Sequence, residues 1–166
     1  MTIADALTQE LDMEAATTRR VLERVPDAQM NWKPAEKSRT LGQLAWHIAV
    51  NPAGVASLAS MSPAQMPNFG PEPTPKSAAE LIATLDESVA RAKTLLAGMD
   101  DAAMTATWTL MAGDKPLMAM PRVAMLRTIM LNHWYHHRGQ LSVYLRQLGV
   151  ALPSIYGPSA DESPFT

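Results

Sequence analysis

The histidines of this chain are concentrated in two short segments. His133, His136 and His137 lie within five consecutive residues, and the fourth, His47, lies in an apolar stretch far earlier in the chain. On a helix, His133 and His137 are four residues apart and share one face, so both could bind one metal ion. His47 on a facing helix would supply a third nitrogen. Such a three-histidine site leaves one coordination position open for chemistry.

The same histidines could instead be ordinary interior residues. For the pair His133 and His137 alone, that interpretation is about as good as metal binding. Three neutral imidazoles buried together without a shared partner would leave polar nitrogens unsatisfied, which favours a metal ion. His136 is rotated by about 100° from His137 around a helix. We therefore expect His136 at the surface or beside a ligand, and not as a ligand itself.

The chemistry of an all-nitrogen site narrows the metal and the reaction. Imidazole ligands suit Zn, Ni, Cu or Fe better than Mg or Ca. Residue 134 is Trp, so the zinc-protease pattern H-E-x-x-H with its glutamate base is absent. No acid flanks the cluster in sequence, and the sequence identifies no general base or other catalytic group. Gln140, Tyr144 and, less strongly, Asn51 are candidates for groups that support the ligands or line a pocket.

Composition excludes several other functions. The chain contains no cysteine, which removes disulfides, thiolate ligands and cysteine nucleophiles. A net charge of −2 and a pI of about 6.1 make DNA binding the weakest alternative. No apolar run reaches the length of a membrane span. The first residues carry an acid and no basic run, so we expect no secretory signal and a cytoplasmic protein.

Helical periodicity predicts four helices in one domain, residues 1–166. Thr2, Thr40 and Ser77 each precede an Asp, Gln or Glu by three residues, as helix-capping residues do. Pro52 is expected to kink or break the second helix near Asn51. The predicted helices span residues 2–25, 41–51, 78–97 and 121–148.

The connections complete the predicted fold. Five prolines between residues 61 and 76 indicate a long irregular crossover. Residues 105–118 are β-prone around Gly113 and predict a short hairpin. The fold class is therefore all-α: a four-helix bundle with a long Pro-rich crossover and a short β-like excursion before the last helix. The predicted inward stripe of that helix is Leu126, Met130, His133, His137, Leu141, Tyr144 and Leu148.

These segments resemble the DinB family, a DinB/YfiT-like group of four-helix-bundle metalloenzymes. The stretch Leu41-Gly-Gln-Leu-Ala-Trp-His47 resembles its second-helix motif. The stretch His133-Trp-Tyr-His-His137-Arg-Gly-Gln, and Tyr144-Leu-Arg-Gln-Leu-Gly-Val after it, resemble its last-helix signature. The tail from Pro153 to Glu162 and Trp32-Lys-Pro also fit.

The resemblance implies a divalent metal, nickel or zinc, on His47, His133 and His137, and a homodimer in many members. It also implies a low-molecular-weight thiol cosubstrate, such as bacillithiol, mycothiol or glutathione, in a transferase or isomerase reaction. The open coordination position would then hold the thiol as thiolate.

Three functions compete at this stage. The first is a metal-dependent thiol transferase, or a related isomerase or hydrolase, that acts on a small-molecule substrate. The second is a non-enzymatic metal-stabilised bundle or interaction module, and the third a metal-free bundle. Neither a nucleic-acid nor a membrane partner is expected. Asp161 and Glu162 are weaker candidates for acids that fold over the site.

Overall fold

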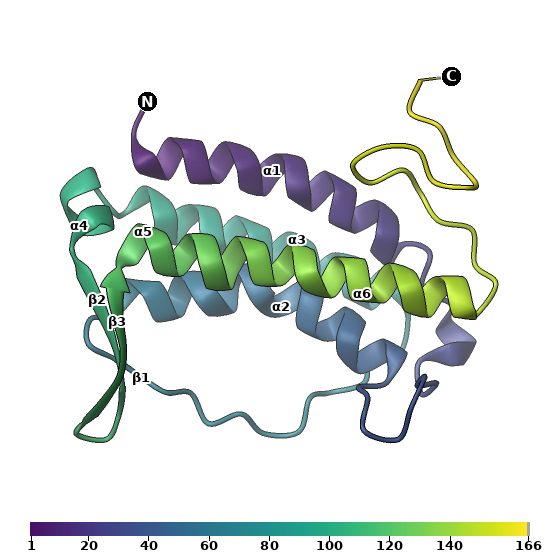
Figure 1. The fold of residues 1–166 in the computed structure, drawn as a ribbon, viewed down its shortest axis with the longest axis horizontal. Helices are drawn as coiled ribbons and strands as arrows, with labels where there is room; N and C mark the ends of the chain where they lie inside the picture. The colour runs from purple at the N-terminus through teal and green to yellow at the C-terminus, as the bar shows by residue number, and fades with distance from the viewer. Residues whose placement is uncertain (166) are drawn as a thin grey trace.

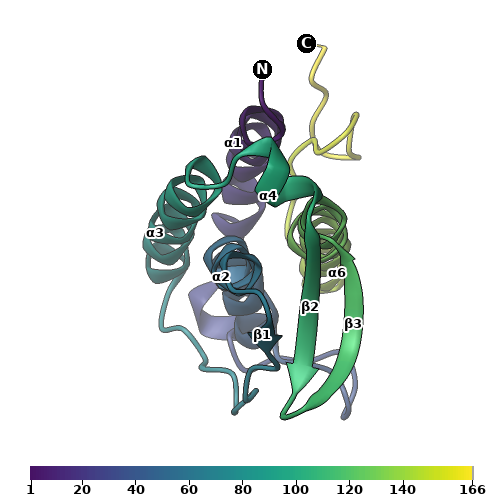
Figure 2. The same ribbon diagram turned by 90° about the vertical axis from the view of Figure 1, so that its left-hand side faces the viewer.

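Four long helical segments lie side by side (Figure 1 and Figure 2). The computed structural model describes residues 1–165. The first three helices are α1 (Ile3–Leu22), α2 (Leu41–Ser60) and α3 (Ala78–Ala97). The fourth segment consists of α5 (Arg122–Met125), a π-helical stretch (Leu126–Asn132) and α6 (His133–Gln147). The smaller elements are a 3-10 turn (Asp27–Gln29), β1 (Ala64–Gln65), α4 (Asp101–Thr105), β2 (Thr107–Ala112) and β3 (Lys115–Pro121).

The first three helices begin where their capping residues predict. Thr2 and Asp5 exchange side-chain and backbone hydrogen bonds at the start of α1. Thr40 and Gln43 do the same at the start of α2, and the Ser77 hydroxyl caps α3. Each cap satisfies backbone N–H groups that have no partner inside the helix. The predicted starts are therefore confirmed, whereas α1 ends at residue 22, slightly before the predicted end.

Of the two outcomes predicted at Pro52, a kink or a break, the break is wrong, because α2 continues past the proline to Ser60. A proline at this position removes the N–H that would bond to the Ile48 carbonyl. The indole Nε1 of Trp134 donates to that carbonyl instead, at 2.8 Å. The N–H of Ala53 is displaced and donates to the Ser88 hydroxyl at 3.0 Å. Side chains from two other helices thus replace the backbone hydrogen bonds that are lost at Pro52.

The fourth helical segment was predicted to be one regular α-helix, but in the structure a π-helical stretch interrupts it. Its π-helical stretch pairs N–H groups with carbonyls five residues back, as His133 does with Thr128. The amide of Asn51 donates to the Met130 carbonyl at 2.7 Å and so supports this wider turn from α2. Most of the predicted inward stripe is buried, while His133 and Leu148 are half-buried.

The predicted excursion is a hairpin within a small sheet. β2 and β3 pair antiparallel, and Gly113 forms their turn with φ of +58°. β1 adds a parallel third strand through Ala64 and Leu110. The expected all-α class is therefore correct for the bundle but omits a three-stranded sheet at one end, which faces the viewer in Figure 2. Within residues 1–165, no helix is both long and apolar enough to cross a membrane.

Replacing Trp134 by Phe tests the repair at Pro52. The change leaves the buried Ile48 carbonyl unpaired, so we expect the free energy of unfolding to fall by about 1–3 kcal/mol. In a Pro52→Ala background, residue 52 again offers an N–H to this carbonyl, and the loss should be smaller. Urea unfolding of the four proteins measures the coupling. Equal losses in both backgrounds would show that the indole contributes by packing alone.

Candidate metal centre

The three predicted ligand residues converge between α2 and α6. The Nε2 atoms of His47 and His133 are 3.0 Å apart, and candidate ligand nitrogens from His47, His133 and His137 all lie within 4.8 Å of one another. The ring centroids are separated by 4.3 to 5.2 Å with the rings edge to face. His136 is exposed and lies outside this group, as predicted. We call His47, His133 and His137 the histidine triad.

Two hydrogen bonds between α2 and the fourth helical segment fix the triad. Trp134 and Ile48, which share the indole–carbonyl bond, are the sequence neighbours of His133 and His47. The Asn51 amide makes the second bond, to the Met130 carbonyl, one turn away. Asn51 was expected to support a histidine directly. It acts on the backbone of the facing segment instead.

A carboxylate from the crossover orients His47. The Nδ1 atom of His47 lies 2.9 Å from Oε1 of Glu72. An Nδ1–H donor in this contact leaves a lone pair on Nε2, the nitrogen that faces the triad. The other carboxylate oxygen of Glu72 accepts from Nε of Arg39 at 2.5 Å. Sequence reasoning missed Glu72 because it lies in the irregular crossover, where no periodicity predicts which side chain meets the bundle.

Gln140 plays the corresponding part for His137. The amide oxygen of Gln140 lies 3.0 Å from His137 Nδ1, which again leaves Nε2 for the triad. The prediction that Gln140 supports the site is confirmed. Tyr144 is buried beside the site, packs edge to face on Trp32 and donates to the Arg39 carbonyl at 3.5 Å. It is core with its hydroxyl at the edge, as expected.

The acids of the C-terminal tail do not fold over the triad. Asp161 accepts from Arg146 at 2.5 Å and from the Leu152 N–H at 2.8 Å. Glu162 pairs with Arg20 of α1. The tail is therefore tied to the side of the bundle where α1 and α6 meet (Figure 1). That expectation was wrong because basic residues on the two helices bind these carboxylates elsewhere.

The arginine that follows His137 has a structural role. Arg138 is buried and pairs with the Glu14 carboxylate at 2.6 Å, while it also donates to the Thr18 hydroxyl at 3.1 Å. Its guanidinium reaches the hydroxyl of Tyr156 in the tail at 2.5 Å. The ion pair therefore holds α1 and the tail against α6, on a different face of α6 from the triad.

Burial keeps the triad neutral. It lowers the pKa of His137 to about 4, and it lowers the pKa values of His47 and His133 as well. The positive charge of Arg39 lowers the pKa values of His47 and His133 further. Neutral imidazoles carry the lone pairs that metal ions bind. The triad is therefore in its ligand form at neutral pH.

The donor set fits one tetrahedral ion. A tetrahedral zinc site with Zn–N bonds near 2.0–2.1 Å places its nitrogens about 3.4 Å apart. The His47 and His133 Nε2 atoms are 3.0 Å apart and all three candidate ligand nitrogens lie within 4.8 Å of one another, which is compact enough for one ion; two nitrogens that face each other at 3.0 Å also require a proton or a cation between them. Among residues 1–165 no fourth histidine and no carboxylate joins the group. The arrangement is that of an open site.

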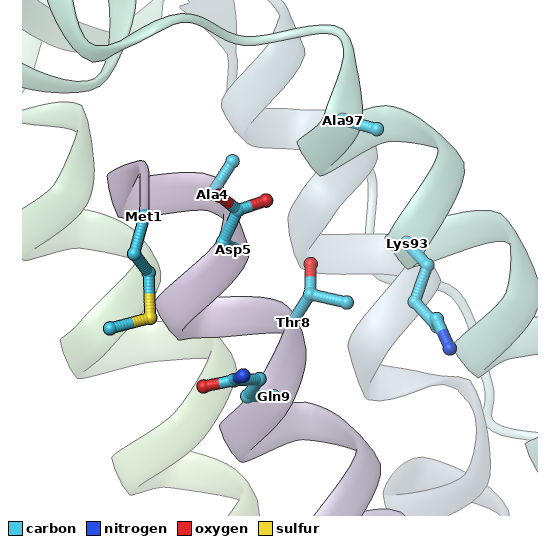
Figure 3. A pocket seen from close by; sticks show the side chains of 7 residues that line it. All are labelled: Met1, Ala4, Asp5, Thr8, Gln9, Lys93 and Ala97. Atoms are coloured by element: carbon cyan, nitrogen blue, oxygen red, sulfur yellow. The ribbon is translucent and has the colours of Figure 1, made fainter.

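Two surface hollows lie away from the triad. A depression of about 580 Å³ lies between the start of α1 and the end of α3, and Figure 3 shows Asp5, Thr8 and Lys93 along it. A second, of about 530 Å³, adjoins it. Neither is lined by a histidine. The convergence of ligand atoms, and not a concave shape, identifies the candidate site.

Fold and site together define a helical-bundle protein with a cluster of three histidines that could hold a metal ion. Comparison with known proteins identifies its family. The DinB family profile matches residues 1–164, and the chain belongs to the DinB family.

Similar proteins cover nearly the whole chain. YrdA of Bacillus subtilis, an uncharacterized protein, is 26% identical over 162 residues, which is 95% of this chain and 90% of YrdA. A DinB-like protein from Bacillus cereus has a similar structure, with a TM-score of 0.70, 24% identity, and coverage of 92% of this chain and 97% of that one. YfiT from Bacillus subtilis, a probable metal-dependent hydrolase with an unusual four-helix bundle topology, has a TM-score of 0.64, 17% identity and coverage of 89% of each chain. The fold inferred from the resemblance is confirmed.

The lowered pKa of His137 predicts a pH-dependent stability for the metal-free protein. In the unfolded chain the His137 imidazole has a pKa near 6.5, whereas in the folded protein its pKa is about 4. Between these two pH values the unfolded chain therefore binds a proton that the folded protein does not. Folding stability should therefore fall as pH drops from 7 to 5, by on the order of 2 kcal/mol for this residue. Urea unfolding at both pH values tests this. The His137→Gln variant lacks the group and should lose less stability; an equal loss would contradict the prediction.

Proposed function

We propose that the chain binds one divalent transition metal, zinc or nickel, through the histidine triad. We further propose that it uses this centre to join a low-molecular-weight thiol to a small electrophile. The observation that carries the proposal is the convergence of three neutral imidazoles within 4.8 Å, without a fourth protein ligand among residues 1–165. When bound, a divalent ion supplies Lewis acidity that stabilises a thiolate at neutral pH.

The state of Glu72 favours a thiol over water as the nucleophile. One of its carboxylate oxygens contacts His47 and the other accepts from Arg39, so neither is free to take a proton from water. Hydrolysis also needs an acid for the leaving group, and among residues 1–165 the carboxyl group that contacts the triad is that of Glu72, which is already paired with His47 and Arg39. A thiol has a pKa near 8.5 and can lose its proton to solvent without a protein base.

The proposed step balances without another reactant. The sulfur lone pair forms an S–C bond to the electrophile, and the bond from that carbon to the leaving group breaks with its electron pair on the leaving group. The proton of the thiol goes to solvent. In this step the triad would hold the ion, while Glu72 and Gln140 would orient the imidazoles of His47 and His137.

Two other functions remain candidates. The similarity to YfiT supports metal-dependent hydrolysis as the second. A non-enzymatic, metal-stabilised bundle is the third; it requires a closed site, in which no small ligand reaches the ion and chelation mainly costs stability. A homodimer, a small-molecule substrate and a cytoplasmic location stay predictions. Analytical ultracentrifugation would measure the oligomeric state.

Elemental analysis of untagged protein tests the metal site. Wild type should hold about one zinc or nickel ion per chain. The His47→Ala and His137→Ala variants should lose it, because each removes one of three ligands. His136→Ala is the matched control, since it removes a neighbouring imidazole outside the triad. Absence of metal from wild type, even after zinc or nickel is added, would refute the proposal.

Glu72 should strengthen metal binding without touching the metal. Loss of a hydrogen-bonding group behind a histidine ligand lowers metal affinity by about 10- to 100-fold. We expect Glu72→Ala to weaken zinc binding by this amount, and Glu72→Gln by less, because its amide oxygen can still accept from His47 Nδ1. Competition with a chromogenic chelator measures the affinities. Glu87→Gln, an exposed change on α3, is the control; equal affinities in all four proteins would show that Glu72 does not orient His47.

A further inference from the structure

Arg39 is a cation linked to the triad through one carboxylate, that of Glu72. It directly precedes the α2 capping residue Thr40, and its Nε donates to Glu72 at 2.5 Å. The same carboxylate contacts His47 at 2.9 Å. One side chain thus separates the guanidinium from a triad imidazole. The influence of Arg39 on the pKa values of His47 and His133 shows that its field reaches both rings.

Most of the Arg39 hydrogen-bonding capacity is unused. The side chain is 41% exposed, and within residues 1–165 its two terminal nitrogens donate to no protein group. Glu72 takes only Nε. The end of the guanidinium therefore presents its N–H fork to solvent beside the triad. This fork matches a carboxylate in a two-bond arrangement, which a lysine cannot provide.

The charge balance at the centre also calls for an anion. The three imidazoles are neutral, so they offset none of the charge of a divalent ion. The negative charge of Glu72 is offset by Arg39. A thiolate would cancel only part of the remaining charge, so a second negative group on the same ligand is still attracted.

We propose that Arg39 binds a carboxylate of the thiol cosubstrate while its sulfur occupies the open position of the centre. The inference rests on the proposed function and narrows it to thiols that carry a carboxylate several ångström from the sulfur. Arg39 is then a specificity-determining residue. Its existing bond to Glu72 holds the guanidinium in place before the ligand arrives, which reduces the entropy lost on binding.

A pair of matched probes tests the inference on zinc-loaded protein. The probes are 6-mercaptohexanoate and 6-mercaptohexan-1-ol, which differ only in the terminal group. Calorimetry should show that wild type binds the acid about 10- to 100-fold more tightly than the alcohol, as expected for a charge-assisted pair. Arg39→Gln should remove this preference by weakening the binding of the acid far more than that of the alcohol. Lys37→Gln, an exposed cation in the same loop, should keep the preference.

The outcomes separate the two proposals. Thiol binding with no preference for the acid, or a preference that survives in Arg39→Gln, would overturn the role of Arg39 and leave the thiol site standing. Equal weakening of both probes in Arg39→Gln would mean that the residue acts only through Glu72 on the metal ligands, which also overturns it. Failure of zinc-loaded wild type to bind either thiol would overturn the proposed function and this inference together. Zinc content is measured in every variant, and Arg39→Lys should recover only part of the preference.

Discussion

The carbonyl of Ile48 sets the position of everything at the candidate site. Pro52 deprives it of its helical partner, and a buried carbonyl without a partner is costly. The indole of Trp134 supplies the missing N–H at 2.8 Å. Because Ile48 and Trp134 each adjoin a triad histidine in sequence, this one bond sets the register between α2 and α6. The proline that weakens α2 as an isolated helix is therefore what allows the two helices to be joined at this point.

Two residues outside the triad and one buried ion pair further determine how the histidines are oriented. Glu72 and Gln140 contact the Nδ1 atoms of His47 and His137, and so direct both Nε2 atoms to a common point. On another face of α6, Arg138 pairs with Glu14 and holds α1 in place. A buried ion pair contributes little net stability compared with apolar packing, but it permits one arrangement of its partners. Here that arrangement fixes how α6 is rotated, and hence where its histidines point.

The sequence predicted those features that depend on interactions between residues close together in the chain. The caps at Thr2, Thr40 and Ser77 depend on residues within one helical turn, and they were predicted correctly. The convergence of the triad was predictable because His133 and His137 are at helical spacing on the apolar face of one helix and His47 is on the apolar face of another. The continuity of α2 through Pro52 was not, since it depends on a tryptophan 82 positions later in the printed sequence. The π-helical stretch, the strand β1 and the placement of Glu72 likewise depend on tertiary contacts that leave no periodic pattern.

The neutrality of the ligands constrains the chemistry as much as their geometry does. A centre built from three imidazoles keeps the full charge of its ion, unlike one that includes a thiolate or carboxylate ligand. The one carboxylate that approaches, Glu72, is already committed to His47 and Arg39. In the proposed reaction, neutralising charge would arrive with the substrate. The proposed thiol would bring one negative charge on its sulfur and a second on its carboxylate, and the guanidinium of Arg39 would bind the second. Water bound to such a centre would also ionise near neutral pH, but it would bring one negative charge, so the charge balance separates the two nucleophiles only through the second anionic group of the thiol.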